Sequence, residues 1–388
     1  MAARAGSVAR PLYRPMRARN PAESRGQTQL ELLFDLAFSA ASGFAAVRLA
    51  HMLGTGAVGT AVLGFAMVFF AIWWAWLNFA WFCSAYDTDD GLTWMVTTLL
   101  ILGAATLAAG VPGAVAERDF AVITVGYAVM RLPLAAQWVR AAVGDPARRA
   151  TCLRFALGMV VLQLAWFGRL ALPERWMLAA FLVLALCEVA VPPWARRHGS
   201  LPTNPGHLAG RYGRFTLTVA AQVIVATVHA LRLGLESPGN GPLLVVAVTT
   251  ATAAVALLWL YHAVPHATVA ASGGARIWEY GHYLLVGAMG AVGGAARLLA
   301  ESTAAPGTQR WAALPLAVAV AVVLLSLWLF GVLPGQDRPG LAHPTCAVLV
   351  VLSALLIPSA LWTAGVVVLL LLATAAVEGL GSRDDEPT

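Results

Sequence analysis

The chain contains no lysine, and charged residues of every kind make up only 11 % of its 388 positions. Soluble globular domains carry about twice that share, so the composition excludes an ordinary soluble fold. Arginine alone supplies the basic side of the formal net charge of +6. Because such an arginine bias is typical of a GC-rich genome, we do not interpret it as nucleic-acid binding and expect no nucleic-acid partner.

The sequence also lacks the common signatures of cofactor and metal chemistry. Its four cysteines, Cys83, Cys152, Cys187 and Cys346, stand singly, which argues against a zinc site and against a disulfide framework. There is no Walker A loop, no G-x-G-x-x-G after a strand pattern, no H-E-x-x-H and no G-x-S-x-G. We therefore expect no cofactor and no metal, and these absences weigh against an enzyme without deciding the question.

What the chain does have is apolar sequence in blocks of helical length, and hydrophobic residues make up 60 % of it. After a first block at 28–53, eleven more follow at 57–83, 92–111, 119–142, 152–170, 175–194, 212–234, 242–263, 277–299, 311–333, 342–357 and 359–378. Most approach the ~20 residues needed to cross the hydrocarbon of a bilayer. The predicted fold class is an all-α membrane protein, a polytopic bundle of about 12 transmembrane helices. Only Ile357-Pro358-Ser359 separates the last two blocks. If these two blocks form one kinked or re-entrant element, the chain has eleven spans.

Two repeated halves are a further prediction. A shift of 181 residues lays Phe34 on Phe215 and Arg48-x-x-His51 on His229-x-x-Arg232, as two six-helix halves of parallel topology would. We divide the chain into a disordered Arg-rich tail (1–27), a first membrane half (28–200), a second membrane half (201–380) and a short acidic tail (381–388). Arginines concentrate in the tail and in the loops on the same side, which predicts that both termini are cytoplasmic in a cell-membrane protein surrounded by lipid.

The first block begins with two carboxylates. Charged side chains inside a membrane helix often mark a functional site, so this block is the first place to look for one. Glu31 and Asp35 are four residues apart and share one helix face. Thr28-x-x-Glu31 has the spacing of a capping box, so Glu31 has a structural alternative to a functional role. Asp35 lies one turn further along, where a binding or relay role stands against a structural ion pair.

Other polar residues fall at the same predicted depth, near the cytoplasmic ends of their helices. His207, Arg211, Arg214, Thr218 and Gln222 form a stripe at helical spacing, which predicts either interhelical hydrogen bonds or a ligand-lined cavity. The candidates for substrate binding or proton relay are Glu31, Asp35, Arg131, Glu188, His207, Arg211, Gln222, His262 and His282.

Four motifs resemble the bacterial low temperature requirement A (LtrA) family of multi-pass membrane proteins. They are E-L-L-F-D-L-x-F at 31–38, Trp73-Trp74-x-Trp76, His207-x-x-x-Arg211-x-Gly213-x-Phe215 and Tyr280-x-His282. The resemblance covers most of the chain and implies the membrane architecture rather than a known activity. This sequence departs from the family at Ala221-Gln222-Val223, where relatives carry a Gly-Glu-Ser-like step. Any chemistry that depends on that glutamate is absent here or uses Gln222 differently.

The first function hypothesis is a transporter or permease-like protein for a small solute or lipid-like molecule, with a polar cavity open to the cytoplasm. Asp35 titrates or pairs with Arg211 in this hypothesis, and the two halves rock about the site. The second is an intramembrane enzyme in which Glu31, Asp35 and a nearby histidine perform acid–base chemistry on a lipid or hydrophobic metabolite. The third is a non-catalytic membrane component whose polar network is structural.

Overall fold

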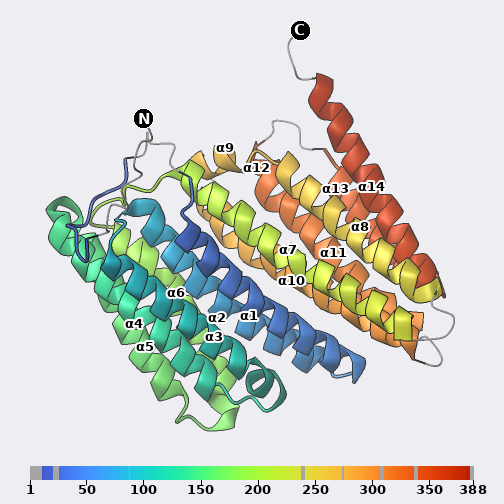
Figure 1. Ribbon diagram of the computed structural model, residues 1–388, viewed down its shortest axis with the longest axis horizontal. Helices are drawn as coiled ribbons and strands as arrows, with labels where there is room; N and C mark the ends of the chain where they lie inside the picture. Colours follow the sequence, from blue (N-terminus) through green and yellow to red (C-terminus); the bar gives the residue numbers. More distant parts are fainter. Residues whose placement is uncertain are drawn as a thin grey trace, which may run out of the picture. The chain divides into compact units, whose positions relative to one another are not determined.

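The computed structural model describes residues 11–20, 26–86, 88–236, 241–272, 275–305, 310–335 and 340–384. Every regular element within these ranges is a helix, so the predicted all-α class is confirmed (Figure 1). The long helices are α1 (Gln29–Gly54), α2 (Val58–Ala85), α3 (Gly91–Ala116), α4 (Ala121–Gly144), α5 (Arg149–Arg169), α6 (Glu174–Arg196), α7 (Pro205–Glu236), α8 (Gly241–Ala263), α10 (Ala275–Ala304), α11 (Leu314–Leu327), α13 (Ala342–Leu356) and α14 (Ala360–Asp384). The short elements are η1 (Pro146–Arg148), α9 (His266–Ala271), η2 (Arg310–Ala313), the π-helical η3 (Trp328–Val332) and α12 (Leu333–Gly335).

Eleven helical segments of the described chain are long and apolar enough to cross a membrane, which makes this a multi-pass membrane protein. The eleventh predicted block, 342–357, is the exception. It forms α13, whose 15 residues reach only about 22 Å at the rise of an α-helix, less than the ~30 Å of hydrocarbon. The chain is extended at Ile357, and α13 packs against both α11 and α14. The last two apolar blocks are therefore two separate helices, of which one is short.

Two compact units share the helices. Unit 1 comprises residues 1–37, 74–109 and 120–208, and unit 2 comprises residues 38–73, 110–119 and 209–388. Helices α1, α2, α3 and α7 contribute residues to both units. The two predicted halves, 28–200 and 201–380, are continuous stretches of sequence, whereas each unit combines separate stretches. The division into halves stays a prediction. At the C-terminus, residues 381–384 continue α14, and residues 385–388 lie outside the described part of the chain.

Unit 1 is built on α4, α5 and α6, which lie side by side (Figure 1). The first turns of α1 pack against the last turns of α2, with the ring centroids of Phe34 and Phe79 4.2 Å apart. The sequence predicted disorder throughout residues 1–27, but residues 11–20 lie against this unit. Met16 and Arg19 are 4 % exposed, and residue 18 forms an isolated bridge with Tyr86. Residues 1–10 and 21–25 are outside the described ranges.

Unit 2 is organised around α10, which packs on α8, α9 and α11, while α14 packs on α8 (Figure 1). One face of α10 is made of glycines that let neighbouring backbones approach closely. A methyl group at Gly294 would collide with the backbone carbonyl of Ala46 in α1. A methyl group at Gly293 would lie 3.1 Å from the carbonyl carbon of Gln222 in α7. Because these glycines have no side chains, the backbone of α10 can lie close to α1 and α7.

We expect Gly294→Ala to lower the stability of the protein by about 1–3 kcal/mol, because the added methyl group forces α1 and α10 apart. The matched control is Gly168→Ala in α5, where a methyl group meets nothing within 4 Å. That control should be neutral or slightly stabilising, since alanine favours helix over glycine. Thermal unfolding in detergent measures both, and equal melting temperatures for the two variants would contradict the close approach.

Candidate functional site

A cavity of about 550 Å³ lies in unit 1, and all of its lining residues belong to that unit. Its wall combines residues 26–31 around the start of α1, the last turns of α2, the start of α3 and two residues of the N-terminal segment 11–20. The charged residues in the wall are Arg19, Glu31 and Asp89, and Cys83 and Tyr86 add a thiol and a phenol. We call this cavity the Glu31 pocket.

Glu31 caps α1 and contacts a second predicted site residue. Its Oε2 accepts a hydrogen bond from the backbone N–H of Thr28 at 2.9 Å, and the Thr28 hydroxyl accepts one from the Glu31 N–H at 3.2 Å. The capping box predicted from the spacing is confirmed. The same Oε2 lies 3.4 Å from Nε2 of His207, so the structure brings these two candidates together. Glu31 thus has a structural role and still lines the pocket.

Asp35 is completely buried one turn further along α1. Its Oδ1 accepts a hydrogen bond from the indole N–H of Trp76 at 2.7 Å, and its Oδ2 accepts one from the side-chain amide of Gln27. Because Gln27 also lines the Glu31 pocket, it connects the buried carboxylate to the cavity wall. The predicted pairing of Asp35 with Arg211 joins residues of different units and stays a prediction.

Arg131 and Glu188 form a buried ion pair inside unit 1. Glu188 also accepts hydrogen bonds from the indole N–H groups of Trp74 and Trp166, each at 3.0 Å, and lies 3.5 Å from the hydroxyl of Tyr127. Arg131 donates to that hydroxyl at 2.8 Å. Four donors surround this carboxylate, and they come from α2, α4 and α5. The cluster therefore joins these helices to α6 as a polar centre within apolar helices.

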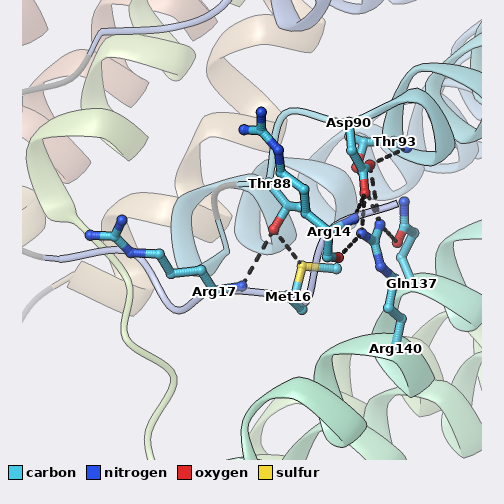
Figure 2. Close-up of polar contacts among 8 residues, drawn as sticks. All are labelled: Arg14, Met16, Arg17, Thr88, Asp90, Thr93, Gln137 and Arg140. Atoms are coloured by element: carbon cyan, nitrogen blue, oxygen red, sulfur yellow. Dashed lines mark hydrogen bonds and ion pairs between the residues drawn. The ribbon is translucent and has the colours of Figure 1, made fainter. Parts of the chain in front are cut away.

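A second buried ion pair fixes the N-terminal segment 11–20, as Figure 2 shows. Asp90, which precedes α3, pairs with Arg140 of α4 and accepts hydrogen bonds from the backbone N–H groups of Arg14 and Thr93 at 2.8 and 2.9 Å. Arg140 also donates to the backbone carbonyl of Arg14 at 2.5 Å. Burial alone would raise the pKa of Asp90, but the bonds from Thr93, Arg140 and Arg14 outweigh it and hold that pKa below its usual value.

Arg19 comes from the same segment and was not among the residues predicted from sequence. Its backbone N–H donates to the carbonyl of Ala85 at 2.8 Å, and its Nε donates to the carbonyl of Cys83 at 3.2 Å. These two bonds hold the guanidinium in the wall of the Glu31 pocket. Its Nη1 is buried and has no hydrogen-bond partner among the described residues. Arg19 therefore brings a guanidinium to the cavity wall, and one of its nitrogens is buried without a partner in the described part of the chain.

In unit 2, His282 belongs to a cluster of aromatic rings and histidines. His282 Nδ1 donates to the carbonyl of Trp278 at 2.8 Å, and its Nε2 lies 3.2 Å from the hydroxyl of Tyr261. His266 contacts the carbonyl of Tyr261 through Nε2 at 2.8 Å and accepts from the indole of Trp278 at 3.1 Å. Burial lowers the pKa of His266 to about 4, so this imidazole is neutral near pH 7. Each histidine nitrogen in this network has a partner, as in a structural core.

The remaining candidates in unit 2 do not gather into one site. Arg211 is completely buried in α7. Gln222 lies between α1 and α10, with its amide nitrogen 3.4 Å from the backbone and hydroxyl oxygens of Ser39. His262 has an exposed side chain, and its Nδ1 contacts the carbonyl of Leu258. Arg214 of the predicted polar stripe is exposed as well, so only part of that stripe faces protein.

We expect Arg140→Gln to release the N-terminal segment, because it leaves the buried Asp90 carboxylate without its counter-ion at a cost of about 3–5 kcal/mol. Hydrogen exchange measured by mass spectrometry should then be at least tenfold faster over residues 11–20. The control is Arg148→Gln, which breaks a pair with Asp145 at a side chain that is 33 % exposed and should have little effect. Unchanged exchange in Arg140→Gln would show that other contacts hold the segment.

Comparison with known proteins identifies the family but not the activity. No group of three or more His, Cys, Asp or Glu side chains is placed to hold a metal ion in the described ranges. No curated protein and no solved structure matches the chain. The model of the family described as bacterial low temperature requirement A protein (LtrA) matches residues 27–377. That match includes the capped start of α1, most of the pocket wall and every predicted site residue, and the chain belongs to the low temperature requirement A family.

Proposed function

We propose that the protein is a permease-like transporter that binds a small solute in the Glu31 pocket. The observation that carries this proposal is the cavity itself, which holds about 550 Å³ and has Glu31, Asp89 and Arg19 in its wall. Ligand pockets typically enclose about 300–1,000 Å³ and combine apolar walls with a few polar groups. Ionisable residues around a cavity in a membrane protein are the usual marks of a substrate or proton pathway.

The predicted orientation places this pocket toward the cytoplasm. Its wall includes the N-terminal ends of α1 and α3 and the C-terminal end of α2. With the N-terminus in the cytoplasm, as the arginine distribution predicts, all three ends lie on the inner side of the membrane. The pocket then corresponds to the inward-open state of a carrier, which must also present its site to the outside at another stage of the cycle.

We assign the proton-coupled step to Asp35, Glu31 and His207. Gln27 connects Asp35 to the pocket wall, and His207 lies 3.4 Å from Glu31. A change of charge at either carboxylate therefore changes the electrostatic potential in the cavity. Carboxylate and imidazole groups in this arrangement are suited to pass a proton between them. Arg131 and Glu188 are left out of the relay, because Glu188 is held by Arg131 and by two indole N–H groups and neither residue lines the pocket.

We expect Asp35→Asn to abolish pH-dependent uptake while membrane insertion is retained, since asparagine removes the charge but its amide oxygen still accepts from Trp76. Solutes that enter proteoliposomes with protons can be identified with a pH-sensitive dye trapped inside. The control is Glu174→Gln, a carboxylate with an exposed side chain in the same unit. Normal uptake by a well-inserted Asp35→Asn variant would remove Asp35 from the mechanism. Absence of flux for every solute tested would favour a non-transporting membrane component.

Cys83 offers a direct test of access to both sides. It lines the pocket and is 8 % exposed. In a variant where Cys152, Cys187 and Cys346 are changed to serine, a small cationic methanethiosulfonate should modify Cys83 from the cytoplasmic side of the membrane. A transporter should also allow slower modification from the outside, and a bound solute should protect the thiol. Modification from one side alone under all conditions would contradict transport and leave a one-sided binding site.

A further inference from the structure

We propose that the Glu31 pocket binds a small amphipathic zwitterion, with Arg19 holding its anionic group and Glu31 holding its ammonium group. This inference names the class of solute and rests on the proposed function only for the claim that the solute is transported. Its physical basis is a pocket wall that carries both signs of charge beside aromatic surface.

The anionic group of the ligand is inferred from Arg19. This side chain is 4 % exposed, and its Nη1 has no hydrogen-bond partner among the described residues. The bond from Nε to the carbonyl of Cys83 fixes the plane of the guanidinium in the pocket wall. A buried N–H of a charged group without an acceptor is costly, and a guanidinium matches the two oxygens of a carboxylate. A ligand carboxylate would supply the missing acceptor.

The cationic group of the ligand is inferred from the carboxylates of the same wall. Glu31 is 6 % exposed, and its Oε2 already accepts from Thr28. Asp89 accepts from the indole of Trp94 at 3.0 Å. A carboxylate offers about four acceptor positions and opposite charge, so both groups are of the type that binds an ammonium. Two carboxylates and one guanidinium leave the wall acidic once a ligand carboxylate has neutralised Arg19.

The apolar part of the ligand is inferred from four aromatic side chains. Phe79, Phe82, Tyr86 and Trp94 line the pocket together with the charged residues. Aromatic faces attract cations and also contact apolar side chains, so they suit a ligand that carries both. The volume suits a free solute the size of an amino acid, whereas a lipid with two long acyl chains exceeds it. We therefore infer a free zwitterion rather than the headgroup of a membrane lipid.

Three probes of nearly equal size separate the charge requirements. Phenylalanine carries both charges, phenethylamine carries only the ammonium and 3-phenylpropionate carries only the carboxylate. Calorimetric titration of the full-length protein in nanodiscs should give a Kd for phenylalanine at least tenfold lower than for either analogue. A short-chain phosphatidylethanolamine tests the lipid headgroup as the source of the zwitterion and should bind more weakly than phenylalanine.

Variants assign each charge to its residue. Arg19→Gln should raise the Kd for phenylalanine about tenfold and remove its advantage over phenethylamine. Arg19→Lys keeps the charge and should restore part of the affinity, which separates charge from folding. Glu31→Gln preserves the capping box, because glutamine also caps, and should remove the advantage over 3-phenylpropionate. The control is Arg17→Gln, an exposed side chain of the same segment, which should bind like the unmodified protein.

Equal affinity for all three probes, or tighter binding of a singly charged one, would overturn the proposal. So would the absence of saturable binding for phenylalanine, tryptophan and leucine up to 10 mM by a folded protein. Tighter binding of the phosphatidylethanolamine would identify a lipid site and overturn the assignment to a free solute. These results are independent of flux: binding without transport rejects the proposed function alone, and transport of a solute with one charge rejects the zwitterion alone.

Discussion

A charge inside an apolar helix bundle is tolerated only where hydrogen-bond donors or a counter-ion surround it. Removing one partner of such a buried pair costs about 3–5 kcal/mol, a large share of the ~5–15 kcal/mol that holds a typical protein folded. Unit 1 satisfies this requirement at Glu188, Asp35 and Asp90. Because apolar helix faces do not by themselves specify which side turns toward a neighbour, these polar centres decide how the helices of the unit face one another.

The Glu31 pocket is where the same requirement is left partly unmet. The N-terminal segment 11–20 is fixed by the ion pair of Asp90 and Arg140, and it carries Arg19 into the cavity wall. There Nη1 of Arg19 has no partner among the described residues, and the same wall carries Glu31, which caps α1, and Asp89, which precedes α3. Other buried arginines of unit 1, such as Arg169, also have a guanidinium nitrogen without a partner among the described residues, but Arg19 is the one of them that lines this cavity. A ligand completes the hydrogen bonding that the chain leaves open.

The sequence predicted what depends on local pattern and on the thickness of a membrane. Helix-length apolar blocks gave the fold class, and Thr28-x-x-Glu31 gave the capping box, because both are read within a few residues. It listed Glu31, His207, Arg131 and Glu188 without pairing them, since the rotation of each helix about its axis is not encoded locally. His262 was named as a candidate for substrate binding or proton relay, and its side chain is exposed. Arg19 was missed because backbone hydrogen bonds, which leave no side-chain pattern, hold its segment in place.

The most direct test is a high-resolution experimental structure of the protein in a lipid nanodisc with phenylalanine present. The account predicts non-protein density in the Glu31 pocket that extends from Nη1 of Arg19 to the Glu31 carboxylate, with the apolar part against Phe79 and Trp94. It would be contradicted by a pocket that contains only water, or by an Arg19 whose Nη1 is bonded to the protein itself. In that case the cavity is a packing feature, and the polar centres of unit 1 serve stability alone.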